Sequence, residues 1–252
     1  KEVQAKRGAY YTPLFLVNYI LNETVTSFFS RNPQKIDCKV LDPACGSGVF
    51  LVETLRKIIN QYHDNEPNCK QNSEGYKNKL KELLLENIFG IDKDENAVNV
   101  AIFSLYVTLL DYLQPPEIVS FTFPNLLNNN FFVADFFDLN HNYNDLLGKF
   151  SCKFDFIVGN PPWGKIDDSV ILYEKYWRLR EKSEKSKIRI NNKQIAQAFL
   201  IRISDFNFNE CGFIITSKVL YNSNARDFRL YFLSNFAIRT IFELSSVRHE
   251  VF

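Results

Sequence analysis

A short predicted strand that starts at residue 39 leads directly into a glycine-rich loop, and this junction constrains the fold more than any other feature. The loop contains Gly46 and Gly48, and residues 49–62 then follow a helical pattern. Glycine permits a tight turn and a close approach of the backbone to a ligand, while the first helical turn offers unpaired N–H groups. The junction therefore predicts a strand–loop–helix unit of the Rossmann-like type. A dinucleotide-binding loop is the alternative, but the third glycine position of that fingerprint holds Leu51.

Three further apolar runs also end in polar residues. Residues 88–91 lead into Asp92, and residues 131–134 lead into Asp135, while a third run occupies residues 154–159. The carboxyl ends of parallel strands lie at one edge of an open α/β sheet, which is where such sheets bind ligands. We therefore expect a doubly wound α/β domain with a mostly parallel sheet. Beyond these runs, the pattern predicts a helix at 193–208, a strand at 212–217, a helix at 225–235 and a strand at 238–244.

The run at 154–159 is followed by Asn160, Pro161, Pro162 and Trp163. Two consecutive prolines stop the strand and remove two N–H donors, so the backbone has to turn there. Asn160 Oδ1 and the Pro161 carbonyl can each accept one N–H of a planar amine, and Trp163 can stack on the ring that carries it. Taken alone, the segment has a plainer alternative, because Asn-Pro is also an ordinary turn signal.

Together these motifs resemble those of the amino-methyltransferases that methylate adenine N6 in DNA, which occur in bacterial restriction–modification and related phage-defence systems. Residues 8–13 resemble the N-terminal cofactor motif of that family, and residues 42–48 resemble its main cofactor loop. The order of the motifs, with the N-terminal motif before the cofactor loop and the NPPW segment last, is that of the gamma arrangement. The resemblance extends from residue 8 to residue 252. It implies S-adenosylmethionine as the cofactor and double-stranded DNA as the substrate.

The resemblance also implies roles for individual residues. Asp92 would bind the ribose of the cofactor and Asp135 its adenine amine. The four residues of the NPPW segment would receive the flipped target base, and Phe252 would pack against the other face of that base. The remaining cofactor-binding residues expected from the resemblance are Tyr11, Thr12, Pro13, Asp42, Ala44, Gly46 and Gly48.

The resemblance further implies that the chain is a fragment. In such folds a last strand returns to the sheet and a DNA-recognition domain follows, and neither is expected within residues 1–252. The sequence contains no Met, which agrees with an incomplete chain. A nuclease or a specificity domain or subunit is the further partner that systems of this kind imply.

Two rival functions stay open at this point. Some NPP-type methyltransferases modify an RNA adenine or a protein glutamine amide, because any planar NH₂ group fits the same two acceptors. The chain could also be a DNA-binding regulatory subunit that no longer methylates. The presence of competent residues at all the catalytic positions argues against that second possibility.

Two polar segments interrupt the α/β pattern. Residues 60–79 are dense in Asn, Lys and Glu and predict a surface insertion before a further short helix. Residues 174–193 are rich in Lys and Arg and follow the NPPW segment closely. A solvated face is the plain interpretation of such a charge run, but its position favours a mobile lip that contacts DNA phosphates. The residues expected to meet phosphates are Lys175, Arg178, Arg180, Lys182, Lys185, Lys187 and Arg189.

Composition limits the remaining possibilities. A chain of 252 residues with 46% hydrophobic content can bury one sizeable core, so residues 1–252 are expected to form a single catalytic domain. The formal net charge is +1, so DNA affinity has to come from a local patch. The five cysteines are scattered without C-x-x-C spacing, which predicts neither a metal site nor disulfides. The longest apolar stretch, residues 101–113, is too short to span a bilayer. We expect a soluble protein of the bacterial cytoplasm.

Overall fold

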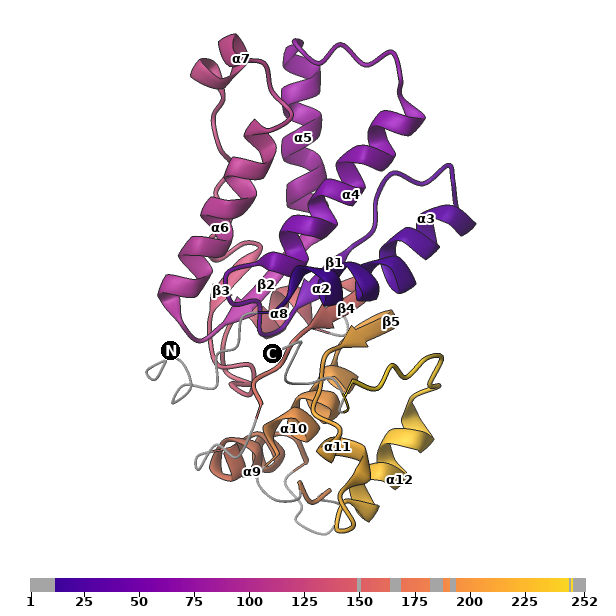
Figure 1. Ribbon diagram of the computed structural model, residues 1–252. Helices are drawn as coiled ribbons and strands as arrows, with labels where there is room; N and C mark the ends of the chain where they lie inside the picture. The colour runs from indigo at the N-terminus through magenta and orange to yellow at the C-terminus, as the bar shows by residue number, and fades with distance from the viewer. Residues whose placement is uncertain are drawn as a thin grey trace.

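The computed structural model describes residues 12–148, 151–163, 169–181, 188–190, 194–244 and 246. A five-stranded sheet forms the centre, in the order β3-β2-β1-β4-β5, and every neighbouring pair is parallel (Figure 1). Because β2 and β4 flank β1 on opposite sides, the winding of the chain reverses at β1, which is the usual place for a ligand site in an open α/β sheet. The strands are β1 (Val40–Asp42), β2 (Ile88–Asp92), β3 (Phe131–Val133), β4 (Lys153–Gly159) and β5 (Asn207–Phe213).

Successive strand residues face two separate hydrophobic cores. In β1, Val40 belongs to one core and Leu41 to the other, and Ile88 and Phe89 divide in the same way in β2. This alternation is the two-residue period of a strand with both faces buried. The expected doubly wound α/β architecture is confirmed.

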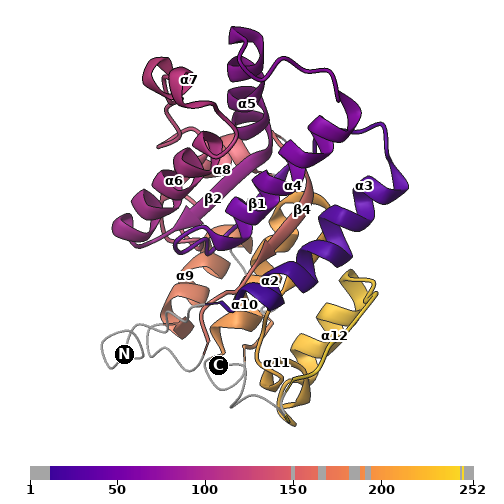
Figure 2. The ribbon, with the colours of Figure 1, turned by 45° about the horizontal axis from the view of Figure 1, so that its top comes forward.

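Helices cover both faces of the sheet, with α4, α5 and α6 on one side and α9, α10 and α12 on the other (Figure 1). Along the first side, α2 runs over the half of the sheet that contains β4 (Figure 2). The first layer contains α2 (Leu14–Leu21), the π-helical turn η1 (Asn22–Thr26), α3 (Ser27–Arg31), α4 (Val49–Asn65), α5 (Glu74–Asn87) and α6 (Glu95–Leu110), with α7 (Pro115–Ser120) projecting beyond it. The second layer contains α8 (Tyr143–Leu147), α9 (Ser169–Glu181), α10 (Ile195–Arg202), the 3-10 turn η3 (Ile203–Asp205), α11 (Lys218–Tyr221) and α12 (Arg226–Asn235).

The C-terminal half departs from the sequence prediction in two places. The predicted helix at 193–208 ends earlier, because β5 begins at Asn207 rather than at residue 212. The predicted strand at 238–244 is wrong, since these residues are not assigned to a strand. They are held instead by side chains, with Phe242 stacked on Tyr19 at 4.9 Å and Arg239 Nη1 2.9 Å from Glu210 Oε2 of the edge strand β5.

The polar insertion is also shorter than predicted. Residues 60–65 are the last turns of α4, and residues 74–79 are the first turns of α5, so only residues 66–73 are irregular. Ser73 begins α5 as its N-cap, and its Oγ accepts the Tyr76 N–H at 3.1 Å. The polar residues at 60–65 and 74–79 lie in the end of α4 and the start of α5, so their polar composition did not indicate a loop.

The described residues hold no helix that is long and apolar enough to cross a membrane. The same residues contain no group of three or more His, Cys, Asp or Glu side chains placed to hold a metal ion.

Candidate active site

The carboxyl end of β1 carries Asp42, which is only 1% exposed. Its Oδ1 accepts the Ala44 N–H at 3.0 Å. Burial raises the pKa of this carboxyl from its usual 3.8 to about 8, the Ala44 N–H opposes the shift and Asp92 adds to it. A Cβ on Gly159, at the end of β4, would lie 2.6 Å from Asp42 Oδ1. Glycine at 159 is therefore required for the two central strand ends to approach each other.

The loop between β1 and α4 has the conformation that its glycines predict. Gly46 has φ +51° and Gly48 has φ +85°, in the left-handed region that other residues rarely adopt. Gly48 is also the N-cap of α4, and a Cβ there would lie 2.9 Å from Ala101 Cβ of α6. The second glycine is thus needed for its backbone angle and for the packing of two helices. α4 begins at the carboxyl edge of the sheet, and the first turn of a helix has N–H groups without partners inside the helix.

Asp92 joins the end of β2 to this loop. Its Oδ2 accepts the Gly46 N–H at 2.8 Å, and its Oδ1 accepts the Asp94 N–H at 2.9 Å. Each carboxylate oxygen retains a further lone pair that could accept from a ligand hydroxyl. The structure thus assigns Asp92 a second task, the fixing of the glycine loop, which the sequence did not reveal.

Asp135 follows β3 at the same edge and is half-buried. The Ala134 N–H donates to Asp92 O at 2.9 Å, which brings the ends of β2 and β3 together. Asp135 Oδ1 accepts the Phe137 N–H at 2.8 Å, so the carboxylate is part of a tight turn. Phe136 and Phe137, which follow it, are buried in the second core.

Asn160, at the end of β4, is bound to the N-terminal segment. Its Nδ2 donates to Thr12 Oγ1 at 3.0 Å, across 148 positions of sequence. Its Oδ1 is buried, and no hydrogen-bond donor of the described residues reaches it. Buried acceptors are nearly always paired in folded proteins, so an acceptor without a partner at a ligand-binding edge indicates a binding position.

The residues around Asn160 are held in place by hydrogen bonds to backbone carbonyl oxygens. Pro161 is buried, while Pro162 and Trp163 are half-buried. Trp163 Nε1 donates to Ile214 O at 3.4 Å, and the Ile214 N–H donates to Gly159 O at 3.0 Å. The turn after β4 is therefore fastened to the chain that follows β5.

Of the remaining residues expected to bind the cofactor, Ala44 and Pro13 are described. Ala44 is half-buried in the loop after β1. Pro13 is the N-cap of α2, and its carbonyl accepts the Leu16 N–H at 3.0 Å. Tyr11 and Phe252 lie outside the described residues.

The basic segment is helical at its start. Residues 174–181 belong to α9, and Tyr173, Tyr176 and Trp177 of this helix pack in the second core. The mobile lip that contacts DNA phosphates stays a prediction. Lys175, Arg178 and Arg189 are exposed. The side chains of Arg180, Lys182, Lys185 and Lys187 lie outside the described residues.

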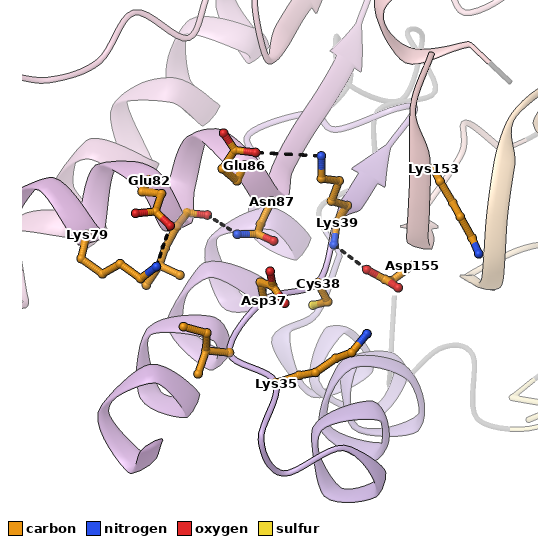
Figure 3. A pocket seen from close by; sticks show the side chains of 12 residues that line it. Lys35, Asp37, Cys38, Lys39, Lys79, Glu82, Glu86, Asn87, Lys153 and Asp155 are labelled. Atoms are coloured by element: carbon orange, nitrogen blue, oxygen red, sulfur yellow. Dashed lines mark hydrogen bonds and ion pairs between the residues drawn. The ribbon is translucent and has the colours of Figure 1, made fainter. Parts of the chain in front are cut away.

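A cavity of about 490 Å³ opens at the opposite, amino edge of the sheet, between α5 and the starts of β1 and β4 (Figure 3). Two ion pairs lie in its lining, with Lys79 Nζ 2.6 Å from Glu82 Oε1 and Lys39 Nζ 4.0 Å from Glu86 Oε2. The Lys39 N–H also donates to Asp155 Oδ2 at 2.9 Å. None of the residues expected to take part in catalysis or cofactor binding lines this cavity.

Comparison with known proteins gives results for both sequence and structure. A family model described as Eco57I restriction-modification methylase matches residues 86–252. The type II restriction enzyme and methyltransferase RM.Eco57I of Escherichia coli is 26% identical over 286 residues, which cover 100% of this chain and 27% of that protein. The adenine-specific methyltransferase BrxX of Escherichia coli O9:H4 (strain HS) is 37% identical over 78 residues, which cover 30% of this chain and 6% of that protein. The chain therefore spans about a quarter or less of the length of these relatives.

A solved structure shares the fold. It is a nuclease-deletion mutant of the type ISP restriction-modification enzyme LlaGI in complex with a DNA substrate mimic. The superposition gives a TM-score of 0.59 at 14% identity and covers 90% of this chain and 22% of that one.

Proposed function

The chain belongs to the Eco57I restriction-modification methylase family, and we propose that its strand-end site transfers a methyl group from S-adenosylmethionine to N6 of a flipped adenine in DNA. The carboxyl edge of the sheet is the part of the protein proposed to perform this reaction. Its acidic and glycine-rich strand ends would bind the methyl donor, and the turn after β4 would bind the acceptor base.

The observation that carries the proposal is the unpaired Asn160 Oδ1. An adenine amine brings two N–H donors, of which one would pair with this oxygen. The other would pair with the Pro161 carbonyl. Neither Pro161 nor Pro162 has an N–H that could compete for these acceptors.

These two acceptors suit the chemistry of amine methylation. The lone pair of an adenine amine is delocalised into the ring, which makes the amine a poor nucleophile. Acceptors on both N–H groups favour a pyramidal nitrogen and stabilise the positive charge that develops on it, as preorganised groups do in other active sites. The reaction then depends chiefly on holding the two partners in line and close together.

S-adenosylmethionine supplies a methyl group activated by a sulfonium centre. The strand-end residues fit the rest of such a molecule. Asp92 retains lone pairs for ribose hydroxyls, and Asp135 can accept from an adenine amine. Asp42 is buried and mostly protonated at neutral pH, because its pKa is raised to about 8, so a cationic ligand group near it would favour its charged form. Thr12, Pro13, Ala44, Gly46 and Gly48 would shape the methionine end of the site, together with Tyr11.

The acceptor base must leave the duplex to reach Asn160. Flipping costs a few kcal/mol, and stacking on Trp163 would offset part of that cost. Phe252 would cover the other face of the base. Phosphate contacts would come from the exposed basic side chains Lys175, Arg178 and Arg189 and from the rest of the basic segment.

The test is a methyl-transfer assay on the complete polypeptide that carries this chain. Labelled S-adenosylmethionine is incubated with duplex DNA, with RNA of the same sequence and with a glutamine-containing protein, and the labelled product is identified after digestion. N6-methyladenine from DNA alone is the expected product. Label on RNA or on a glutamine amide would change the acceptor, and binding of DNA without any transfer would contradict the catalytic role.

A further inference from the structure

Arg202, the last residue of α10, is only 2% exposed. A buried guanidinium is costly unless its charge is paired and its N–H donors are satisfied. Here Nη1 donates to Asp205 Oδ2 at 2.8 Å, and Tyr176 Oη donates to the same oxygen at 2.8 Å. The charge is therefore neutralised within the second layer, which leaves the other N–H groups of Arg202 available for a different partner.

These N–H groups bind the turn after β3 and the first residues of α8. Arg202 Nε donates to Phe136 O at 3.1 Å. Its Nη2 donates to Tyr143 Oη at 3.3 Å and also to Asn144 Oδ1. The guanidinium carbon lies 5.3 Å from the centroid of the Phe136 ring, at a distance where a cation is attracted to an aromatic face.

Tyr143 also donates a hydrogen bond to the carbonyl oxygen of Phe136. Its side chain is fully buried, and its Oη donates to Phe136 O at 2.7 Å. The carbonyl oxygen of Phe136 thus accepts from both Tyr143 and Arg202, which uses both of its lone pairs. An oxygen held by two donors from different helices cannot rotate without losing both bonds.

The peptide group that contains this oxygen lies next to Asp135. The Asp135 carboxylate is itself bound to the Phe137 N–H at 2.8 Å, so its position depends on the shape of the turn at 135–137. Because Arg202 fixes the carbonyl at the centre of that turn, it also restrains where the carboxylate lies. Arg202 itself is not in the turn and contacts it from α10.

We propose that Arg202 is a positioning residue that sets the selectivity of the site for the exocyclic amine of the cofactor's adenine. It acts by fixing the Phe136 carbonyl and thereby the Asp135 carboxylate. The proposal rests on the proposed function, and specifically on the binding of the cofactor's adenine at Asp135.

The test compares two ligands that differ only at that amine. S-adenosylhomocysteine carries it, and the analogue whose base is unsubstituted purine has a hydrogen in its place. The unmodified protein should prefer the adenine ligand by about tenfold or more, because the purine analogue would leave the Asp135 carboxylate without that N–H donor. In Arg202→Gln the ratio of the two dissociation constants should fall towards one, chiefly through weaker binding of the adenine ligand, and Arg202→Lys should retain part of the preference.

Tyr143→Phe keeps the guanidinium and removes one of the two hydrogen bonds to Phe136 O, so it should reduce the ratio even if Arg202→Gln fails to fold. Arg229→Gln is the matched control. Arg229 Nη1 also donates to a backbone carbonyl, Leu220 O at 3.0 Å, but it lies on α12. Loss of stability with an unchanged ratio is expected for this control.

The outcomes separate this proposal from the proposed function. If Asp135→Ala abolishes the preference while the Arg202 and Tyr143 variants keep it, Arg202 has no positioning role and the adenine site stands. If the unmodified protein binds both ligands without a preference, the Asp135 carboxylate does not contact the amine and the positioning role of Arg202 is overturned, whereas methyl transfer in the assay above would still support the proposed function. In the Asp135→Ala background, Arg202→Gln should change the ratio no further, because the two residues act through one contact.

Discussion

Asn160 and Thr12 are joined by a hydrogen bond of 3.0 Å, in which the amide nitrogen donates and the hydroxyl oxygen accepts. The bond gives the amide nitrogen its acceptor and turns the amide oxygen towards a position where no donor of the described residues reaches it. Thr12 belongs to the segment whose sequence resembles a cofactor motif, and Asn160 belongs to the proposed base site. The two halves of the proposed reaction thus share one direct contact.

Removal of the Thr12 hydroxyl should impair methylation without preventing it. Thr12→Val keeps the size of the side chain and leaves Asn160 Nδ2 without its acceptor. Turnover should fall by about threefold to tenfold, the usual effect of one neutral hydrogen bond. Steady-state assays on duplex DNA measure this, and a loss as large as that of Asn160→Ala would indicate that Thr12 has a role of its own.

Asp92→Ala should weaken S-adenosylmethionine binding by about 1–3 kcal/mol, through lost charge-assisted hydrogen bonds and a looser glycine loop. Calorimetry gives the affinity. Asp155→Ala is a matched control at the amino edge, since Asp155 also accepts through both oxygens, from Lys39 N at 2.9 Å and from Asn209 Nδ2 at 3.1 Å. Equal effects of the two substitutions would argue against ribose binding at Asp92.

The raised pKa of Asp42 makes stability depend on pH. Below its usual pKa of 3.8 the carboxyl is protonated in the folded and unfolded states alike. Between pH 3.8 and about 8 the unfolded chain ionises while the folded protein keeps the proton, so this group's contribution to stability falls as pH rises and is lost above about 8. Denaturant titrations across this range should show a shallower pH dependence for Asp42→Asn. An identical dependence in both proteins would contradict the raised pKa.

Neutralisation of the three exposed basic residues Lys175, Arg178 and Arg189 should lower the salt slope of DNA binding by about three, as expected when three phosphate contacts are lost. Cofactor affinity should stay constant. The control neutralises Lys35, Lys39 and Lys153, which line the cavity at the opposite edge of the sheet. If both triple variants change the slope alike, the segment that includes α9 makes no special contact with DNA.

The strand ends could be predicted because each depends on a short stretch of sequence. An apolar run followed by Asp92, or by Asn160 and two prolines, indicates where a strand stops whatever surrounds it. Gly46 and Gly48 likewise have the backbone angles that their residue type suggested. These local signals were enough to predict the parallel sheet and the edge that holds the site.

The contacts between strand ends could not be predicted in this way. The need for glycine at 159 arises only when β4 lies beside Asp42, and the network of Arg202 joins residues from separate elements. A sequence signal for Arg202 does exist, since it is the one charged residue of the apolar run at 195–203. The predicted strand at 238–244 failed because its apolar side chains do not pack into the sheet, since Ile238, Ile241 and Phe242 are exposed. The segment contacts its neighbours through the side chains of Phe242 and Arg239.

The most direct test of the proposed mechanism is the turnover of Asn160→Ala in the complete polypeptide. The substitution removes the buried acceptor Oδ1 and leaves the cofactor loop intact, so S-adenosylmethionine affinity should be unchanged. Methylation of duplex DNA should fall by about 10²–10³-fold, the typical effect of losing one preorganised hydrogen-bonding group. Asn209→Ala, which removes an amide in β5 beside Asp155, should leave turnover unchanged. Near-normal methylation by Asn160→Ala would contradict the assignment of Asn160 as the acceptor of the target amine.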